Sequence, residues 1–591
     1  MPAAGLDPSW MLGLNQAIAQ GLAFGKDIIF SYGPYSSIYT EAYHPATNLM
    51  MIGGSLYLAV SWWVCLFLLM NGVQWRWILA LCICLSGMIY ARDSLFFSYP
   101  LLVGLATYKT LDSDRKISPY APYFFALLFA PFGLLPLIKA SLLIFCLAVL
   151  ALCFVYILAC KRNILAIICL MTPVISMFLF WSGSGQLPVN LPDFLINTVL
   201  MASGFTDAMG LDGNPVEIIL YMLGCVLICV STLCQKQIRP DSRLFILSLF
   251  LVFLFFSFKS GFIRHNVHAF IPATSILIAA LILPFAFRSK MALPLVIFSL
   301  LIWAYIINHY TNISVFKNIR ANSTTTWHGL KSRMTDNKWL KQNYDLSITF
   351  MKNQASLPVL QGTTDIYSSK QTYLISSENT WSPRPIIQSY SAFSPMLARK
   401  NAQHLQGINA PDNIIFKMEP IDGRIPSLED GASWPLLLAN YQPTHVENDF
   451  LFLRKIHTPA TSQGLTLLKQ EKHYLKELVK VPGKGQPVFA EITIKPTLFG
   501  YLTSTVLKPG QLTIVFELAD GTRRQYRIIT NMAKSTFLIS PLVENTLEFA
   551  MLYRDENALN AKVVKAISIA ATSGSSWQWE KEYSIQFKTQ H

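Results

Sequence analysis

Two aspartates bracket a short amphipathic segment close to the start of this 591-residue chain. Asp7 precedes and Asp27 follows residues 9–22, in which apolar side chains recur at helical spacing. A carboxylate beside a substrate hydroxyl can act as a general base, and a carboxylate at the start of a helix can equally cap the free N–H groups. Both roles remain open for Asp7, with Asp27 as the reserve candidate for the base. Tyr32, in the Tyr32-Gly33-Pro34 turn that follows, is a candidate substrate contact.

A second chemical group consists of charged residues between apolar segments. They are Arg92 with Asp93, then Lys139, then Lys259 with Arg264. Cations at such positions suit the phosphate of a lipid-linked substrate. They can also extend to the membrane surface or pair with Asp93 and lipid head groups. We predict that the loops converge on one face and bind substrate there.

His265 and His268 are three residues apart and share one face if the segment is helical. They can carry protons, cap a helix or ligate a metal. A metal site would need a carboxylate nearby, and Asn266, the residue beside His265, is not one. We therefore predict that the two histidines form hydrogen bonds to substrate or structure and not a metal site. A divalent metal cofactor is left open.

The elements that must position these residues are mostly apolar. Mean hydropathy is +0.39, with 52% hydrophobic and 14% charged residues, which excludes an ordinary soluble protein and indicates a polytopic α-helical membrane protein. About ten spans are predicted within residues 50–309: 50–71, 76–91, 94–108, 120–138, 141–160, 163–181, 215–234, 243–258, 267–287 and 291–309. The net charge of +14 is spread over short loops and the polar C-terminal part, so it does not indicate nucleic-acid binding. All ten cysteines lie between Cys65 and Cys234 without a CxxC pair, which argues against a structural zinc site.

Basic residues occur in alternate loops and give an orientation. By the positive-inside rule those loops are cytoplasmic, whereas the long loop 182–213 has no Lys or Arg and lies outside. Residues 1–49, the first extracytoplasmic loop, and the whole chain after residue 309 then also lie outside. Because an external N-terminus without a preceding span is unusual, we expect the natural reading frame to begin upstream and to add one span.

The C-terminal part divides into two predicted regions. Residues 310–465 read as an extracytoplasmic α/β segment that begins with a polar linker at 322–326. Residues 466–591 alternate with a period of two and contain an Asp520-Gly521 hairpin signal, which predicts a β-sandwich of jelly-roll type. Trp577 and Trp579 near its end suit stacking on sugar rings, although core or membrane-surface positions fit equally well, so carbohydrate binding by this domain is a hypothesis.

Four blocks of the sequence resemble a known superfamily. They are LDPSW (6–10), GLAFGKDIIFSYGP (21–34), FKSGFIRHNVH (258–268) and RPIIQSYSAFSP (384–395). This pattern is similar to a branch of the multi-spanning GT-C glycosyltransferases. The resemblance implies a GT-C-like membrane domain over residues 50–309 in the bacterial cytoplasmic (inner) membrane. It also implies transfer of a sugar from a polyprenyl-phosphate-linked donor to an extracytoplasmic glycan or lipid acceptor, with a catalytic aspartate in the first external loop, which is Asp7 here.

Two departures from the family pattern accompany this resemblance. The usual first span is absent, and Asn266 stands where an acidic residue often follows the Arg-His pair. The competing class is non-enzymatic: a membrane transporter, or a glycan-binding or assembly protein of the cell envelope. A transporter more often has charged or broken helices at mid-membrane and an internal repeat, whereas the polar groups here gather at the predicted outer edge.

Overall fold

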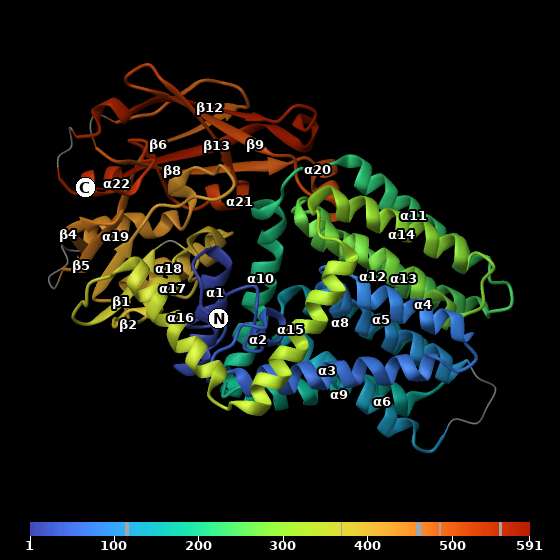
Figure 1. Cartoon of the computed structure of the whole chain (residues 1–591). Coiled ribbons are helices and arrows are strands. Elements are labelled where there is room, and N and C mark those ends of the chain that lie inside the picture. The colour runs from blue at the N-terminus through green and yellow to red at the C-terminus, as the bar shows by residue number, and fades with distance from the viewer. Residues whose placement is uncertain (113–117, 368, 457–463, 484–485, 555–557, 591) are drawn as a thin grey trace.

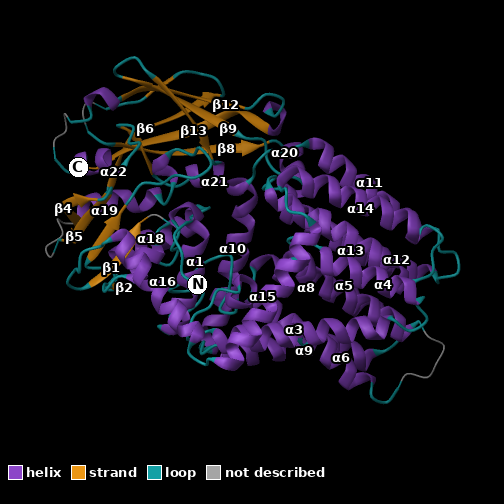
Figure 2. Cartoon of the chain, in the orientation of Figure 1, coloured by secondary structure: helices purple, strands orange, loops and turns teal. Residues whose placement is uncertain are grey.

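The computed structural model describes residues 1–591 except 113–117, 368, 457–463, 484–485, 555–557 and 591. A helical bundle occupies one side of the molecule, and the strands gather on the other side (Figures 1 and 2). The helix α10 (Leu191–Met209) runs between these two parts in Figure 1.

Seven helices in the described part of the chain are long and apolar enough to cross a membrane. The chain therefore has the fold of a polytopic helical protein with a C-terminal strand-rich region. The seven are α3 (Asn48–Leu69), α8 (Ala140–Ala159), α9 (Asn163–Gly183), α11 (Pro215–Leu233), α12 (Pro240–Phe262), the segment Val267–Ala286 formed by η3 (Val267–Ala269) and α13 (Phe270–Ala286), and α14 (Ala292–Tyr310).

The other three predicted spans are helical but do not meet the same criteria. At 13 residues, α4 (Trp75–Gly87) rises about 20 Å, less than the roughly 30 Å of a bilayer core. The second is divided into α6 (Ala121–Phe129), α7 (Pro131–Leu134) and η1 (Leu135–Leu137). The third, α5 (Arg92–Leu111), carries charges at both ends. The predicted number of ten spans is thus not confirmed.

The bundle is organised around α13, which is buried along its whole length. It packs against α5, α11, α12 and α14. A helix that is apolar all round belongs at the centre of a bundle. The outer helices instead leave large apolar side chains exposed, for example Leu56, Val60 and Phe67 on α3, as expected of surfaces that face lipid.

Two predicted non-helical segments are helices. The predicted loop 182–213 contains α10, and the predicted linker 322–326 lies inside α15 (Val315–Thr335), which is followed by α16 (Trp339–Ala355). In α15 the hydroxyls of Ser323 and Thr324 donate to the carbonyls of Ile319 and Arg320, one helical turn back. Hydroxyl side chains that read as a linker are therefore satisfied within the helix.

The α/β segment is built on one five-stranded sheet of order β2-β1-β3-β5-β4. The strands β2 (Thr380–Trp381), β1 (Thr363–Tyr367) and β3 (Asn413–Phe416) are parallel, whereas β5 (Phe450–Lys455) and β4 (Tyr441–Glu447) continue the sheet in antiparallel fashion. Three helices accompany the sheet: α17 (Gln371–Ser376), α18 (Pro395–Gln406) and α19 (Trp434–Asn440).

The last region contains two antiparallel four-stranded sheets. One has the order β10 (Arg523–Ile528), β9 (Leu512–Leu518), β12 (Val564–Ala571), β7 (Val479–Lys480), and the other has the order β11 (Phe537–Ser540), β8 (Val488–Pro496), β13 (Trp579–Gln590), β6 (Leu465–Tyr474). Strands β9 and β13 alternate buried and more exposed residues, so each sheet has one buried face. The predicted hairpin at Asp520-Gly521 joins β9 to β10. Short helices α20 (Leu498–Val506), α21 (Thr530–Ala533) and α22 (Thr546–Met551) connect the strands. The jelly-roll type remains a prediction.

The N-terminal segment lies between the two parts. Its first helix, α1 (Leu6–Ala19), packs on α17 of the α/β segment, and the short α2 (Ser36–Thr40) packs on α3. Gly25 has a φ of +88° and lies so close to Phe194 of α10 that a Cβ would come within 2.4 Å of its backbone. Only glycine fits both the left-handed conformation and this close approach. The turn after α1 is therefore fixed against α10.

Candidate functional site

A cavity of about 1130 Å³ opens between α3, α4, α5, the start of α13 and the start of α15. Most of its lining is apolar, from residues that include Leu58, Trp62, Leu85, Phe96 and Ile271. Its lining also includes the charged or ionisable residues Glu41, Arg92, Asp93 and His268. A space lined by both kinds of residue fits a ligand that combines a hydrocarbon chain with a polar head.

One of the lining residues, Asp93, forms an ion pair with Lys139. The Lys139 ammonium contacts a carboxylate oxygen of Asp93, and both side chains are largely buried. The Tyr39 hydroxyl donates to the other Asp93 oxygen at 2.7 Å, and Lys139 lies 4.5 Å above the Tyr39 ring. Although burial lowers the pKa of Lys139, the Asp93 carboxylate raises it well above its usual value. Lys139 therefore stays charged, but its charge is already balanced.

Arg92 is the more available cation. Its side chain is 40% exposed and lies 3.8 Å from Glu41, which is 67% exposed. Such a pair of exposed groups contributes little stability. The Arg92 guanidinium also lies 5.2 Å from the centre of the Tyr39 ring. Since Arg92 lines the cavity, it can exchange Glu41 for a phosphate.

The orientation of His268 is fixed by its neighbour. The side-chain oxygen of Asn266 accepts hydrogen bonds from the backbone N–H of His268 at 3.2 Å and from its Nδ1–H at 2.7 Å. With the proton on Nδ1, the Nε2 atom carries a lone pair and can accept a proton or a hydrogen bond. His268 lines the cavity. Asn266 is thus the residue that orients this imidazole.

Several of the predicted residues lie around one cavity. Arg92, Asp93 and His268 all line it, and Lys139 contacts Asp93. They come from the start of α5, from the residue before α8 and from the segment between α12 and α13. The structure therefore brings these residues together.

Asp7 is exposed in the first turn of α1, but it is not the helix cap, because Gly5 occupies the N-cap position. The Trp10 indole N–H donates to Asp7 at 3.0 Å, and the Trp10 ring stacks on Tyr32 with ring centres 4.7 Å apart. Tyr32 in turn lies 5.6 Å from the Lys139 ammonium. On its other side, α1 packs on α17 of the α/β segment. The helix that carries Asp7 therefore lies between the membrane bundle and the C-terminal part.

Arg264 is held by a carboxylate that the sequence did not reveal as its partner. The two Arg264 nitrogens donate to both oxygens of Asp422 at 2.7 and 3.1 Å. Asp422 belongs to a charged turn in which Arg424 is fully buried and lies 3.7 Å from Glu429. Burial raises the pKa of Glu429 to about 7. The bidentate pair joins the end of α12 to the α/β segment, so Arg264 acts first as a structural link.

Three predicted site residues lie elsewhere. The Asp27 carboxylate accepts the backbone N–H of Ala23 at 3.0 Å and closes a turn. Lys259 donates to the carbonyls that end α20. His265 is buried and donates to Glu217 of α11 at 2.9 Å, so it does not share a face with His268. The helical-face interpretation is wrong because α12 ends at Phe262 and the chain turns before η3 begins.

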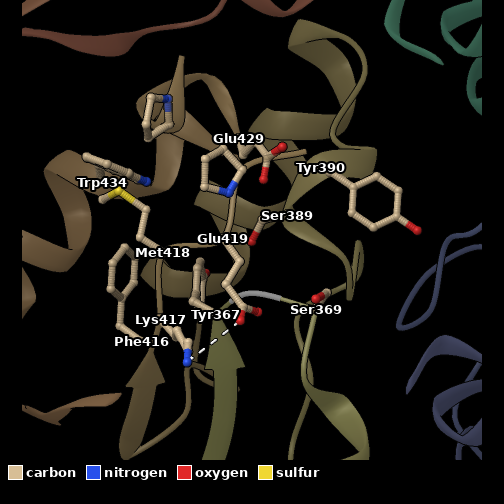
Figure 3. A pocket seen from close by; sticks show the side chains of 12 residues that line it. Tyr367, Ser369, Ser389, Tyr390, Phe416, Lys417, Met418, Glu419, Glu429 and Trp434 are labelled. Atoms are coloured by element: carbon tan, nitrogen blue, oxygen red, sulfur yellow. Dashed lines mark ion pairs between the residues drawn. The ribbon is translucent and has the colours of Figure 1, made fainter. Parts of the chain in front are cut away.

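A second, much smaller pocket lies at the carboxyl ends of the parallel strands β1 and β3. It measures about 20 Å³, room for roughly one water molecule, and is bordered by Tyr367, Phe416 and the Lys417–Glu419 ion pair of 3.7 Å. Figure 3 shows the Tyr390 ring pointing away from the other labelled side chains. The hydroxyls and amides of residues 388–393 that suited sugars in the sequence are mostly buried within the segment.

The tryptophans considered for sugar stacking differ in position. Trp579 is 4% exposed and belongs to the core, whereas Trp577 is 53% exposed. The pattern of two nearby tryptophans therefore does not form a continuous aromatic platform.

Sequence reasoning missed Tyr39, Glu41 and the two tryptophans Trp62 and Trp63 that line the cavity. Tyr39 and Glu41 follow directly on the Tyr32 turn, so the polar stretch before the first span was the available signal. Among the described residues no group of three or more His, Cys, Asp or Glu side chains lies together as metal ligands do.

Comparison of the chain with family models, with curated proteins and with solved structures gave no match.

Proposed function

We propose that the protein is a membrane glycosyltransferase that moves a sugar from a polyprenyl-phosphate-linked donor to a glycan or lipid acceptor at the outer face of a bacterial cytoplasmic membrane. The observation that carries the proposal is the cavity of about 1130 Å³, whose lining is mostly apolar but includes Arg92, Asp93 and His268. A free sugar needs no apolar wall of this size, and a fatty chain alone needs no Arg, Asp and His in the lining.

The donor fits this cavity in one orientation. Its isoprenoid chain lies along Leu58, Trp62 and Phe96 between α3, α4 and α5, and its phosphate meets Arg92. Lys139 adds a permanent positive charge behind the Tyr39 ring, although Asp93 balances most of its field. Charges fixed in advance at the leaving group stabilise the transition state more than groups that must reorganise.

The reaction needs one base and one cation. The acceptor oxygen attacks the anomeric carbon, the bond from that carbon to the phosphate oxygen breaks, and the electron pair leaves with the phosphate, whose charge Arg92 stabilises. The acceptor proton passes to Asp7, which is exposed and held by the Trp10 N–H. His268 Nε2 accepts a hydrogen bond from the sugar or the acceptor and positions it.

The first experiment fills the cavity and measures binding. Ala59 lines the cavity, and its neighbour Val60 is 54% exposed on the outside of α3. We expect Ala59→Trp to abolish saturable binding of polyprenyl phosphate to the purified protein and Val60→Trp to leave it unchanged. Polyprenol without the phosphate serves as the second control. Equal binding by both variants would exclude this cavity as the donor site.

The second experiment separates an enzyme from a binding protein. Asp7→Asn retains donor binding and loses sugar transfer, whereas Asp27→Asn, a change in the neighbouring turn, retains both. Intact transfer in Asp7→Asn would remove Asp7 from the mechanism. Lipid binding without transfer of any sugar tested, even in the unmodified protein, would favour the transporter or assembly alternative.

A further inference from the structure

The helix α20 (Leu498–Val506) exposes an apolar surface outside the membrane bundle. It connects β8 to β9, and its sequence LFGYLTSTV contains no charged residue. Leu498 is 73%, Phe499 71% and Tyr501 61% exposed, and Gly500 is its only buried residue. Soluble surfaces rarely leave such a contiguous group of large apolar side chains in water.

The C-terminal end of α20 is attached to the ends of two membrane helices. The Lys259 ammonium, in the last turn of α12, donates to the carbonyls of Leu507 at 2.9 Å and Thr505 at 3.1 Å. Lys508 forms an ion pair of 2.9 Å with Asp212, three residues before α11 begins. Figure 1 shows α20 beside the ends of α11 and α14. The helix therefore lies at the level where the bundle ends.

The N-terminal end of α20 is equally well held. The Thr497 hydroxyl caps the helix by accepting the Gly500 N–H at 3.0 Å. A Cβ at Gly500 would come within 2.0 Å of the Gln578 carbonyl oxygen, so the backbone of α20 rests directly on the segment before β13. The exposed apolar side chains thus belong to a fixed, ordered helix.

We propose that α20 lies in the plane of the membrane surface and inserts Leu498, Phe499, Tyr501 and Leu502 among the lipids. A short helix that is apolar on its open side and tied to the end of the bundle matches the position of an interfacial helix. Aromatic side chains such as Phe499 and Tyr501 are favoured at that depth. Because α20 carries no charge, its binding depends on apolar area and not on anionic lipid. This contact fixes the orientation of the β-strand region relative to the membrane and is independent of the proposed sugar transfer.

A photocrosslinking experiment on the full-length protein in native membranes tests the proposal. One variant carries the photoreactive amino acid p-benzoylphenylalanine in place of Phe499. The matched control carries it in place of Leu467, which is 52% exposed on β6 and pairs with Lys588. That position is about 30 Å along β13 from Trp579, the strand end nearest to α20. Both side chains are exposed, so neither change disturbs the core, and size-exclusion chromatography of the two variants checks folding.

We expect phospholipid adducts at position 499 by mass spectrometry and at least tenfold fewer at position 467. Adducts of position 499 to a protein, to another part of the same chain, or to nothing at all overturn the proposal, as does equal lipid labelling at both positions. Adding anionic lipid in reconstituted vesicles leaves the labelling at 499 unchanged if apolar area drives the contact. A strong dependence on anionic lipid contradicts that part of the inference.

Discussion

The charge of Arg92 provides the most direct test of the proposal that the cavity binds a phosphate. Arg92→Gln removes the positive charge but keeps a polar side chain of similar reach. The variant should fold normally, because Arg92 and its partner Glu41 are 40% and 67% exposed and lie 3.8 Å apart. An exposed pair of this kind contributes at most about 1 kcal/mol to stability.

The effect on binding is larger. A charge-assisted hydrogen bond to a phosphate contributes roughly 1.5–3 kcal/mol, which corresponds to about a 10- to 150-fold change in Kd. Glu41→Gln should have the opposite effect on affinity, because it removes the negative charge that competes with the phosphate for Arg92. We therefore expect Arg92→Gln to weaken and Glu41→Gln to strengthen the binding of polyprenyl phosphate.

The assay is equilibrium binding of polyprenyl phosphate to the purified protein in nanodiscs at low and at high salt. Arg76→Gln serves as the control, since Arg76 is an exposed cation at the start of α4 and does not line the cavity. The difference between Arg92→Gln and the unmodified protein should shrink at high salt, because salt screens an exposed charge. A Kd for Arg92→Gln within twofold of the unmodified value, or a shift of the Arg92 and Glu41 variants in the same direction, would refute the reasoning.

Three other expectations concern the supporting residues. Arg264→Met leaves Asp422 with only the Arg424 guanidinium, 4.0 Å away, and should lower the free energy of unfolding by about 3 kcal/mol. The double variant Arg264→Met with Asp422→Leu should recover more than half of this loss, measured by thermal or denaturant unfolding. Burial raises the pKa of Glu429 from 4.5 to about 7, so the folded state holds a proton that the unfolded state releases; this stabilisation is complete below about pH 4.5 and is lost as the pH rises through 7, up to about 3 kcal/mol in all. Glu429→Gln should accordingly flatten the dependence of the unfolding temperature on pH between about 5 and 8, and an unchanged slope would contradict the assignment. Asn266→Asp should keep His268 oriented and preserve the binding of polyprenyl phosphate. Asn266→Ala should weaken that binding by roughly 1 kcal/mol. An equal loss of binding in both variants would argue against the orienting role of Asn266.

The helices of the bundle follow from the sequence because long apolar runs leave few alternatives. All ten predicted ranges are helical, but α4 and the broken segment Ala121–Leu137 are short, and hydropathy alone does not tell a full span from a partial one. The helix α10 was missed because its polar and acidic residues read as an external loop. The contact of Gly25 with Phe194 that fixes α10 depends on the folded chain.

The site was predictable in its residue types and only partly in its pairing. The sequence offered Asp93 as a partner for the neighbouring cations, and Lys139 does pair with it across 46 residues. Asp422, which lies 158 residues from its partner Arg264, was not foreseen. Nothing local in the sequence specifies such pairs, which depend on how the helices pack. Lys259 illustrates the consequence, because a cation in the right loop binds the carbonyls at the end of α20 and not the site.

The contacts of the N-terminal segment, which includes α1, determine when during synthesis this segment can reach its final position. The Ile29 N–H donates to the Pro385 carbonyl at 2.8 Å, and Ser9 accepts the Thr372 N–H at 3.4 Å across 363 residues of chain. At a synthesis rate of roughly 5–20 residues per second, those partners emerge about 20 to 70 s after the N-terminal segment. Asp7 thus reaches its final place only when the α/β segment has been made. Until then, an unfinished chain contains the helices of the bundle while its N-terminal segment still lacks the partners that fix it.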